Sequence, residues 1–118
     1  MSDHATAILK STDLERTIEW YQAAGFVLRG RHTVTDDDWC ELARGALIVQ
    51  FASGRTPWPG SPSMTGCFYV PVPDADAALP ELQPPVVSEW GVEDRPWGAR
   101  EVVLRDQDGY VITLTQTL

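Results

Sequence analysis

A chain of 118 residues, 43% hydrophobic and 22% charged, is long enough for one domain with a buried core, and its composition is not that of a disordered chain. Seventeen acidic residues against nine Lys and Arg give a net charge of −8 without a basic patch, which excludes nucleic acid and anionic membrane surfaces as expected partners. No apolar run approaches the roughly 20 residues of a membrane-spanning helix.

The N-terminal stretch and the cysteines indicate the compartment. Met1-Ser2-Asp3-His4 lacks the basic and apolar segments of a secretory signal, so we expect a cytoplasmic protein. Cys40 and Cys67 form neither a Cys-x-x-Cys unit nor a dense framework, and two free thiols are expected. The negative charge either attracts cationic small molecules or simply keeps the protein soluble, and composition does not decide between the two.

The first half of the chain predicts one helix among four strands. Thr12 with Glu15 has the capping-box spacing of a helix start, and Gly25 stands where that helix would end. The expected strands lie at 5–10, 26–34, 39–43 and 46–52, with a polar turn at 36–38 and another around Gly45. A loop rich in Gly, Pro and Ser, from 53 to 63, then separates the two halves.

The second half repeats this order. A helix is expected at 74–82, with Pro80 in its first turn if Asp76 is the N-cap. The strands expected around it lie at 67–72, 86–90, 99–104 and 110–116. A shift of 61 residues sets Asp13 on Asp74, and a shift of 64 sets Gly45 on Gly109 and Ile48 on Ile112. We therefore predict a single domain, 1–118, built from two repeats at about 4–53 and 66–117.

Several segments in fixed order give the chain a specific resemblance. They are Asp13-Leu14-Glu15-Arg16, Trp20-Tyr21, Ala24-Gly25-Phe26, the stretch 69–74, Arg95-Pro96-Trp97-Gly98 and Leu104-Arg105-Asp106-Gln107-Asp108-Gly109-Tyr110. In these residues the chain resembles the vicinal oxygen chelate superfamily of glyoxalases, dioxygenases and bleomycin-resistance proteins, and is closest in character to its metal-free, bleomycin-resistance-like branch. The resemblance implies an α+β fold of two tandem βαβββ modules, whose curved mixed sheets form a cup usually completed in a homodimer.

Metal-dependent members of this family hold a divalent ion in the cup, with one ligand from the first and one from the last strand of each module. Carried over to this chain, the four positions are Thr6, Val49, Cys67 and Thr113. Such a cation needs His nitrogen or carboxylate oxygen, which none of the four supplies, so no metal and no cofactor is expected. His4 shares a face with Thr6 by alternation and is the alternative ligand of an atypical metal site.

Strand alternation from these positions predicts which residues line the cup. The face under the helices would carry Ala7, Leu9, Ile48, Phe68, Val70, Ile112 and Leu114, and the cup would carry Leu47, Val103 and Thr115 beside the four positions. We expect no catalytic residue and a ligand-binding set of Trp39, Glu41, Phe51, Trp58, Tyr69, Trp90, Trp97 and Glu101. Trp97 matches the Pro-Trp-Gly motif of bleomycin-resistance proteins, in which aromatic side chains hold planar rings. Packing in the core or a dimer interface is the alternative role of any one tryptophan.

Three functions follow as hypotheses. The first is a metal-independent binding protein that sequesters a planar, possibly cationic aromatic compound or antibiotic, as bleomycin-resistance proteins do. The second is a metal-independent isomerase, hydrolase or cyclase that uses Glu41 or Glu101 as a general base. The third, a metal-dependent lyase or dioxygenase, needs the ligands that the four carried-over positions lack.

Overall fold

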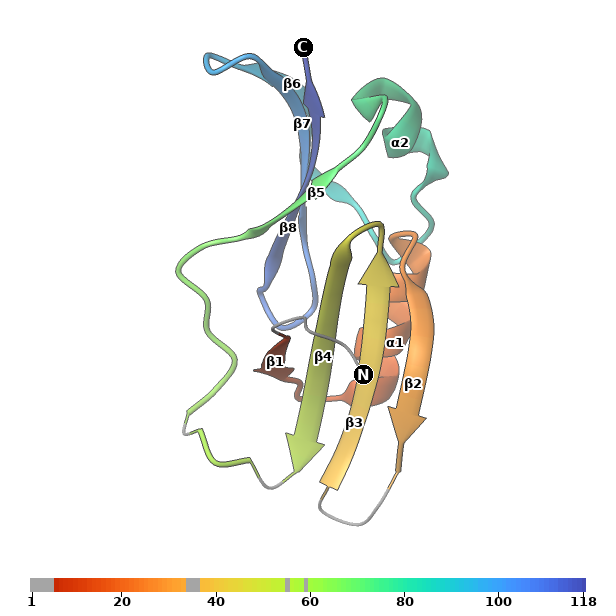
Figure 1. Ribbon diagram of the computed structural model, residues 1–118, viewed down its shortest axis with the longest axis vertical. Coiled ribbons are helices and arrows are strands. Elements are labelled where there is room, and N and C mark those ends of the chain that lie inside the picture. Colours follow the sequence, from red (N-terminus) through yellow and green to blue (C-terminus); the bar gives the residue numbers. More distant parts are fainter. Residues whose placement is uncertain (1–5, 34–36, 55, 59) are drawn as a thin grey trace.

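Two βαβββ modules follow one another in the computed structural model, which describes residues 6–33, 37–54, 56–58 and 60–118 (Figure 1). Module one consists of β1 (Ala7–Lys10), α1 (Leu14–Ala23), β2 (Val27–His32), β3 (Asp37–Arg44) and β4 (Leu47–Gly54). Module two consists of β5 (Phe68–Pro71), α2 (Ala75–Glu81), β6 (Ser88–Arg95), β7 (Ala99–Arg105) and β8 (Val111–Thr117). The predicted α+β fold of two tandem βαβββ modules is confirmed.

Each module forms its own four-stranded mixed sheet. The strand orders are β1-β4-β3-β2 and β5-β8-β7-β6, so the first strand of each module lies beside its last. That pair is parallel in both modules, and the remaining pairs are antiparallel. Among the described residues no helix is long and apolar enough to cross a membrane.

Both helices begin at an aspartate, and neither N-cap is the residue expected. The Asp13 carboxylate accepts a hydrogen bond from the Arg16 N–H at 3.2 Å, while the Thr12 hydroxyl donates to Asp108 Oδ1 at 2.5 Å. Asp74 caps α2 in the same way, so Thr12 and Asp76 are wrong as caps. The predicted turn at 36–38 is also too long, since β3 begins at residue 37 and residues 34–36 lie outside the described part.

Pro80 lies in the last turn of the seven-residue helix α2, not in its first turn as expected. The first-turn placement assumed Asp76 as the N-cap, whereas Asp74 caps the helix two residues earlier. A proline there lacks the N–H that would bond to the Asp76 carbonyl. The helix ends one residue later, at Glu81.

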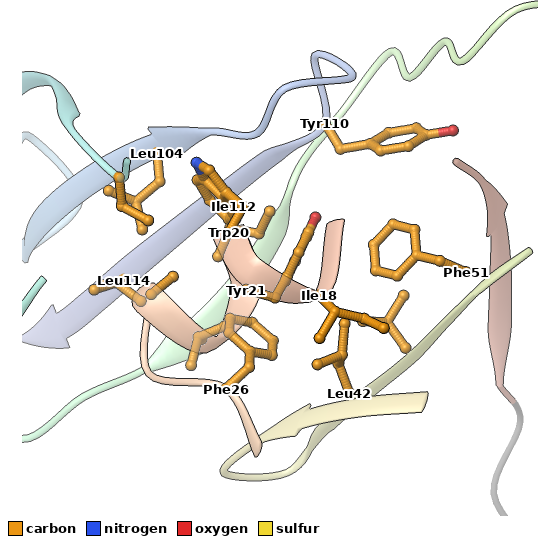
Figure 2. Packing of buried hydrophobic residues seen from close by; sticks show 14 of the residues in the cluster. Ile18, Trp20, Tyr21, Phe26, Leu42, Phe51, Leu104, Tyr110, Ile112 and Leu114 are labelled. Atoms are coloured by element: carbon orange, nitrogen blue, oxygen red, sulfur yellow. The ribbon is translucent and has the colours of Figure 1, made fainter. Parts of the chain in front are cut away.

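The core lies around α1 and includes residues of both modules (Figure 2). The ring of Tyr21, which is fully buried, has its centroid 4.8 Å from that of Phe51 and 5.0 Å from that of Phe26. Ile112 and Leu114 of β8 are fully buried in the same cluster. One helix of module one therefore packs in a core that both sheets share.

The predicted inner and outer faces are correct for module two and wrong for β4. Val49 and Phe51, expected in the cup, are fully buried in the core, where they lie opposite Leu42 and Cys40 of β3. Ile48, expected in the core, lies on the other face by alternation. In module two Ile112 and Leu114 of β8 are fully buried, as expected, and Tyr69 of β5 is exposed on the opposite face.

The parallel strand pairs β1–β4 and β5–β8 show where the alignment of the two halves was wrong. Ala7 lies opposite Val49 in module one, and Phe68, its counterpart 61 residues on, lies opposite Ile112 in module two. Val49 therefore corresponds to Ile112, a shift from 49 to 112 of 63 residues, whereas the sequence alignment used 64. Because side chains alternate with a period of two, this single residue moves every side chain of β4 to the other face.

Candidate functional site

The open face of sheet β1-β4-β3-β2 carries a groove of about 260 Å³. The register sets Trp39 opposite Ala52 and Glu41 opposite Gln50, so these four share the face away from the core. The loop that follows β4 covers one side of the hollow with Trp58. The residues lining this module-one groove are Ile8, Asp38, Trp39, Gln50, Ala52, Ser53, Thr56, Pro57 and Trp58.

Polar groups in and beside the module-one groove are only partly paired. The Gln50 amide donates to Glu41 Oε1 at 2.9 Å, and Arg29 Nε lies 3.8 Å from Glu41 Oε2. The Trp58 indole N–H is buried and has no hydrogen-bond partner among the described residues. The Trp39 ring stacks on the imidazole of His32, with centroids 6.1 Å apart and planes at 22°. Such a groove offers flat aromatic surface, one indole donor and a carboxylate beside it.

The open face of the second sheet is built around a buried carboxylate. Glu101 of β7 is 3% exposed, and Thr115 donates to its Oε2 at 3.2 Å. The Trp97 indole N–H donates to the same oxygen at 3.4 Å, and Arg95 Nε lies 3.5 Å from Oε1. All three contacts are long for hydrogen bonds to a charged group, which prefer about 2.7–2.9 Å.

Aromatic side chains lie beside the Arg95–Glu101 pair and remain in contact with solvent. Tyr69, Trp90 and Trp97 are 53%, 53% and 64% exposed. The Arg95 guanidinium carbon lies 5.9 Å from the ring centroid of Trp90 and 5.8 Å from that of Trp97. Partial desolvation and the negative charge of Glu101 raise the pKa of the Tyr69 phenol. This module-two face, formed by Tyr69, Trp90, Arg95, Trp97, Glu101 and Thr115, combines exposed rings with one partly buried ion pair.

The structure divides the expected ligand-binding residues into three sets. Trp39 and Trp58 line the module-one groove, and Glu41 adjoins it through Gln50. A second set, on module two, holds Tyr69, Trp90, Trp97 and Glu101. Phe51 belongs to neither, because it is buried in the core.

The sequence-based ligand-binding set did not include two residues of the module-one groove and the module-two face. Gln50 was not named among the cup residues because the register predicted for β4 was off by one residue. Arg95 was treated only as part of the Arg-Pro-Trp-Gly signature. Arg95 ends β6 opposite Ala99, and two residues earlier Glu93 lies opposite Glu101, so Arg95 and Glu101 share one face of the hairpin. The short spacing between residues 95 and 99 could have predicted this neighbourhood.

The donors at the four carried-over metal positions do not fit a divalent ion. With the corrected register, Gln50 replaces Val49 beside Thr6, Cys67 and Thr113. The Gln50 amide is engaged with Glu41, and the Thr113 hydroxyl lies 3.7 Å from the Cys67 sulfur. Within the described ranges no three His, Cys, Asp or Glu side chains gather to hold a metal, and His4 lies outside those ranges. One thiol, two hydroxyls and an amide lack the charge that hard cations require.

The two cysteines are free, as expected, and differ in accessibility. Cys67 is exposed at the module-two face, whereas Cys40 is fully buried in the core. Burial raises the pKa of the Cys40 thiol to about 11, so this side chain acts as a small apolar filler.

A second hollow, of about 310 Å³, lies between α1 and the turn that joins β7 to β8. Its lining mixes charges of both signs, and the carboxylate there, Asp106, already accepts three hydrogen bonds. The lining residues are Arg16, Glu19, Trp20, Pro85, Arg105, Asp106 and Gln107. This hollow belongs to the contact between modules and offers no exposed aromatic surface.

Comparisons with known proteins agree with this architecture. The family described as Glyoxalase/Bleomycin resistance protein/Dioxygenase superfamily matches residues 2–114. A bleomycin resistance protein of Klebsiella pneumoniae is 27% identical over 129 residues, covering 98% of this chain and 94% of that relative. Among solved structures, TnmS3, an antibiotic binding protein from Streptomyces sp. CB03234, has a TM-score of 0.74 at 23% identity, with coverage of 100% and 98%. A bleomycin resistance determinant encoded on the transposon Tn5 has a TM-score of 0.62 at 24% identity, covering 98% of each chain.

Proposed function

The chain belongs to the glyoxalase/bleomycin resistance protein/dioxygenase superfamily, and on this premise we propose that it is a metal-independent protein that binds and sequesters a planar, cationic aromatic compound such as an antibiotic. One observation carries the proposal: tryptophans gather on the open face of each sheet, and each group lies next to a carboxylate. The similarity to a bleomycin resistance protein and to an antibiotic binding protein supports an antibiotic as the compound bound.

Aromatic faces and carboxylates together favour planar cations. A tryptophan ring attracts a flat ring by stacking and a positive charge through its negative face. Glu41 and Glu101 supply the opposite charge within each aromatic group, and the net charge of −8 raises the local concentration of cations around the protein. A neutral or anionic ligand would gain only the stacking part of this attraction.

The working form that we propose is a homodimer. Ile8 in the module-one groove and Trp97 in the module-two face are 46% and 64% exposed. The exposed rings of Tyr69, Trp90 and Trp97 form a cluster, and clustered exposed apolar side chains are typical of a surface that a partner covers. Sedimentation equilibrium should give twice the chain mass of 13.1 kDa at the protein concentrations used for binding. A mass that stays at 13.1 kDa under those conditions would contradict the homodimer.

Calorimetric titration with bleomycin and with the planar cationic dye proflavine tests the function directly. We expect saturable binding, and a dissociation constant raised about tenfold by Trp39→Leu or Trp97→Leu, since one stacked ring contributes about 1–1.5 kcal/mol. The matched control is Val87→Ala, which alters an exposed apolar residue between α2 and β6 that is a member of neither aromatic group. The absence of saturable binding for cationic aromatic compounds in general would overturn the proposal.

The enzymatic alternative places a general base at Glu41 or Glu101. Each of these carboxylates already has a protein partner, Gln50 in one case and Arg95 in the other. A carboxylate already engaged by a protein side chain is less free to take a proton from a bound compound, which favours a binding role over proton abstraction. If mass spectrometry shows that the protein converts a bound compound into a product, the protein is an enzyme and the binding role is wrong.

A further inference from the structure

We propose that Arg95 occupies the cation position of its own ligand site, so that a planar cationic ligand binds the module-two face by displacing the Arg95 side chain. The inference rests on the proposed function and adds to it the residue that sets selectivity for charge. A guanidinium group is itself a flat cation, and it lies between two tryptophans and a carboxylate. The position of this guanidinium indicates that the module-two face accepts flat cations.

The geometry defines a three-sided receptor for a cation. The guanidinium carbon of Arg95 lies 5.9 and 5.8 Å from the ring centroids of Trp90 and Trp97, both within the range of cation–π attraction. Glu101 Oε1 lies 3.5 Å from Arg95 Nε on the third side. Because the two rings are 53% and 64% exposed, an incoming molecule can reach the same surfaces from solvent.

Arg95 fits this receptor poorly compared with other arginines of the chain. Arg100 donates to both oxygens of Asp94 at 2.7 and 3.1 Å, and Arg105 donates to Glu89 at 2.7 Å, although these pairs are more exposed. Arg95 Nε is buried and has no hydrogen-bond partner among the described residues. A buried donor and a buried carboxylate that meet at 3.5 Å leave interaction energy unused. A ligand with better-placed N–H groups recovers that energy.

Displacement requires only side-chain rotation. Arg95 is the last residue of β6, and its carbonyl accepts a hydrogen bond from the Gly98 N–H at 3.1 Å, which holds the turn without the side chain. The side chain is 27% exposed, so it already has an opening to solvent. When it leaves, Glu101 faces the ligand with its charge unneutralised.

The test compares a cation with a neutral ring system in Arg95→Met, which keeps a long apolar stem and removes the charge. The dissociation constant of proflavine should fall about tenfold, while that of the neutral tricycle phenazine should stay within about twofold. Arg105→Met, which removes a surface arginine paired with Glu89, is the matched control and should change neither constant. In Arg95→Met/Glu101→Gln the gain for proflavine should disappear.

The outcomes separate this inference from the function on which it rests. If wild-type protein binds proflavine and Arg95→Met binds it equally well or more weakly, the displacement of Arg95 is wrong and the binding function stands. If neither protein binds proflavine or phenazine, both proposals fall. Should Arg95→Met fail to fold, the nitrogen resonance of Arg95 Nε in wild-type protein decides: a shift on adding proflavine but not phenazine supports displacement, and an unmoved resonance at saturation overturns it.

Discussion

Replacing Asp106 with alanine should lower the free energy of unfolding by about 4 kcal/mol, because three hydrogen-bond donors would lose a shared acceptor in the interior. Asp106 Oδ1 accepts the N–H groups of Asp108 and Tyr110, both at 2.9 Å, and Oδ2 accepts the Tyr21 hydroxyl at 2.7 Å. Both Asp106 and Tyr21 are buried. Tyr21 belongs to α1, so this carboxylate connects module one to the β7–β8 turn of module two.

Asp106→Asn is the matched control. It keeps one carbonyl oxygen for the two backbone donors and an amide that can donate to the Tyr21 oxygen, so we expect a loss of about 1 kcal/mol. Urea denaturation followed by circular dichroism measures both variants, and the slopes should match that of the wild type. Equal stability of the alanine and asparagine variants would contradict the account of the network.

The pH dependence of the same pair has a definite sign. Burial raises the pKa of the Asp106 carboxyl above its ordinary value of 3.8, against the lowering effect of its hydrogen bonds. A raised pKa in the folded state means that folding favours the protonated acid, and the associated stability is lost as pH rises through the folded-state pKa. The stability of the wild type relative to Asp106→Asn should therefore increase as pH is lowered from 7 toward 3.8.

Other contacts of this turn explain the Asp-x-Asp-Gly segment. Asp108 accepts from the Thr12 hydroxyl at 2.5 Å, and Gln107 donates to the Thr17 hydroxyl at 2.6 Å. The Tyr110 hydroxyl donates to the Lys10 carbonyl at 2.8 Å. Gly109, with φ of +89°, makes the turn possible. The segment is a contact between the modules, and the capping-box interpretation of Thr12 failed because that hydroxyl is used here.

Sequence patterns located the elements well because each sheet has a buried face and the order of elements repeats in the two halves, although both N-caps were misassigned. They misplaced β4, where Ala46-Leu47-Ile48-Val49-Gln50-Phe51-Ala52 is apolar on both faces except at Gln50. The repeat was aligned there on Gly45 and Gly109, yet the two hairpins differ in length. Arg44 pairs with Leu47 in one hairpin, and Arg105 pairs with Val111 in the other. Glycines in turns of unequal length do not fix strand register.

Only part of the candidate site could be predicted from the sequence. Tyr69 and Glu101 follow from counting every second residue along β5 and β7, because the predicted register of module two was correct. The approach of Trp58 to Trp39 depends on how the loop after β4 folds back over the sheet, and no local pattern encodes that path. The role of Arg95 depends on the hairpin register between β6 and β7, which shifts between Ser88 and Val92.

Phe51→Ala is the second change expected to have a large effect, a loss of about 3–5 kcal/mol in the free energy of unfolding. The Phe51 ring is fully buried, with its centroid 4.8 Å from that of Tyr21 and 6.0 Å from that of Tyr110. Removing it leaves a cavity that Tyr21 on α1 and Tyr110, just before β8, cannot close without moving. Guanidinium denaturation gives the loss as a lower midpoint at unchanged slope.

Comparing Phe51→Ala with Gln50→Ala tests which face of β4 points into the core. Gln50→Ala changes a side chain that lines the module-one groove and donates to Glu41, so it should alter stability by less than about 1 kcal/mol while weakening proflavine binding. The two effects should therefore separate: Phe51→Ala lowers stability, and Gln50→Ala lowers affinity. The opposite pattern would restore the register in which Val49 and Phe51 face the ligand. A register shift of one residue moves every side chain of β4 to the opposite face, so each register predicts its own pattern of stability and affinity changes.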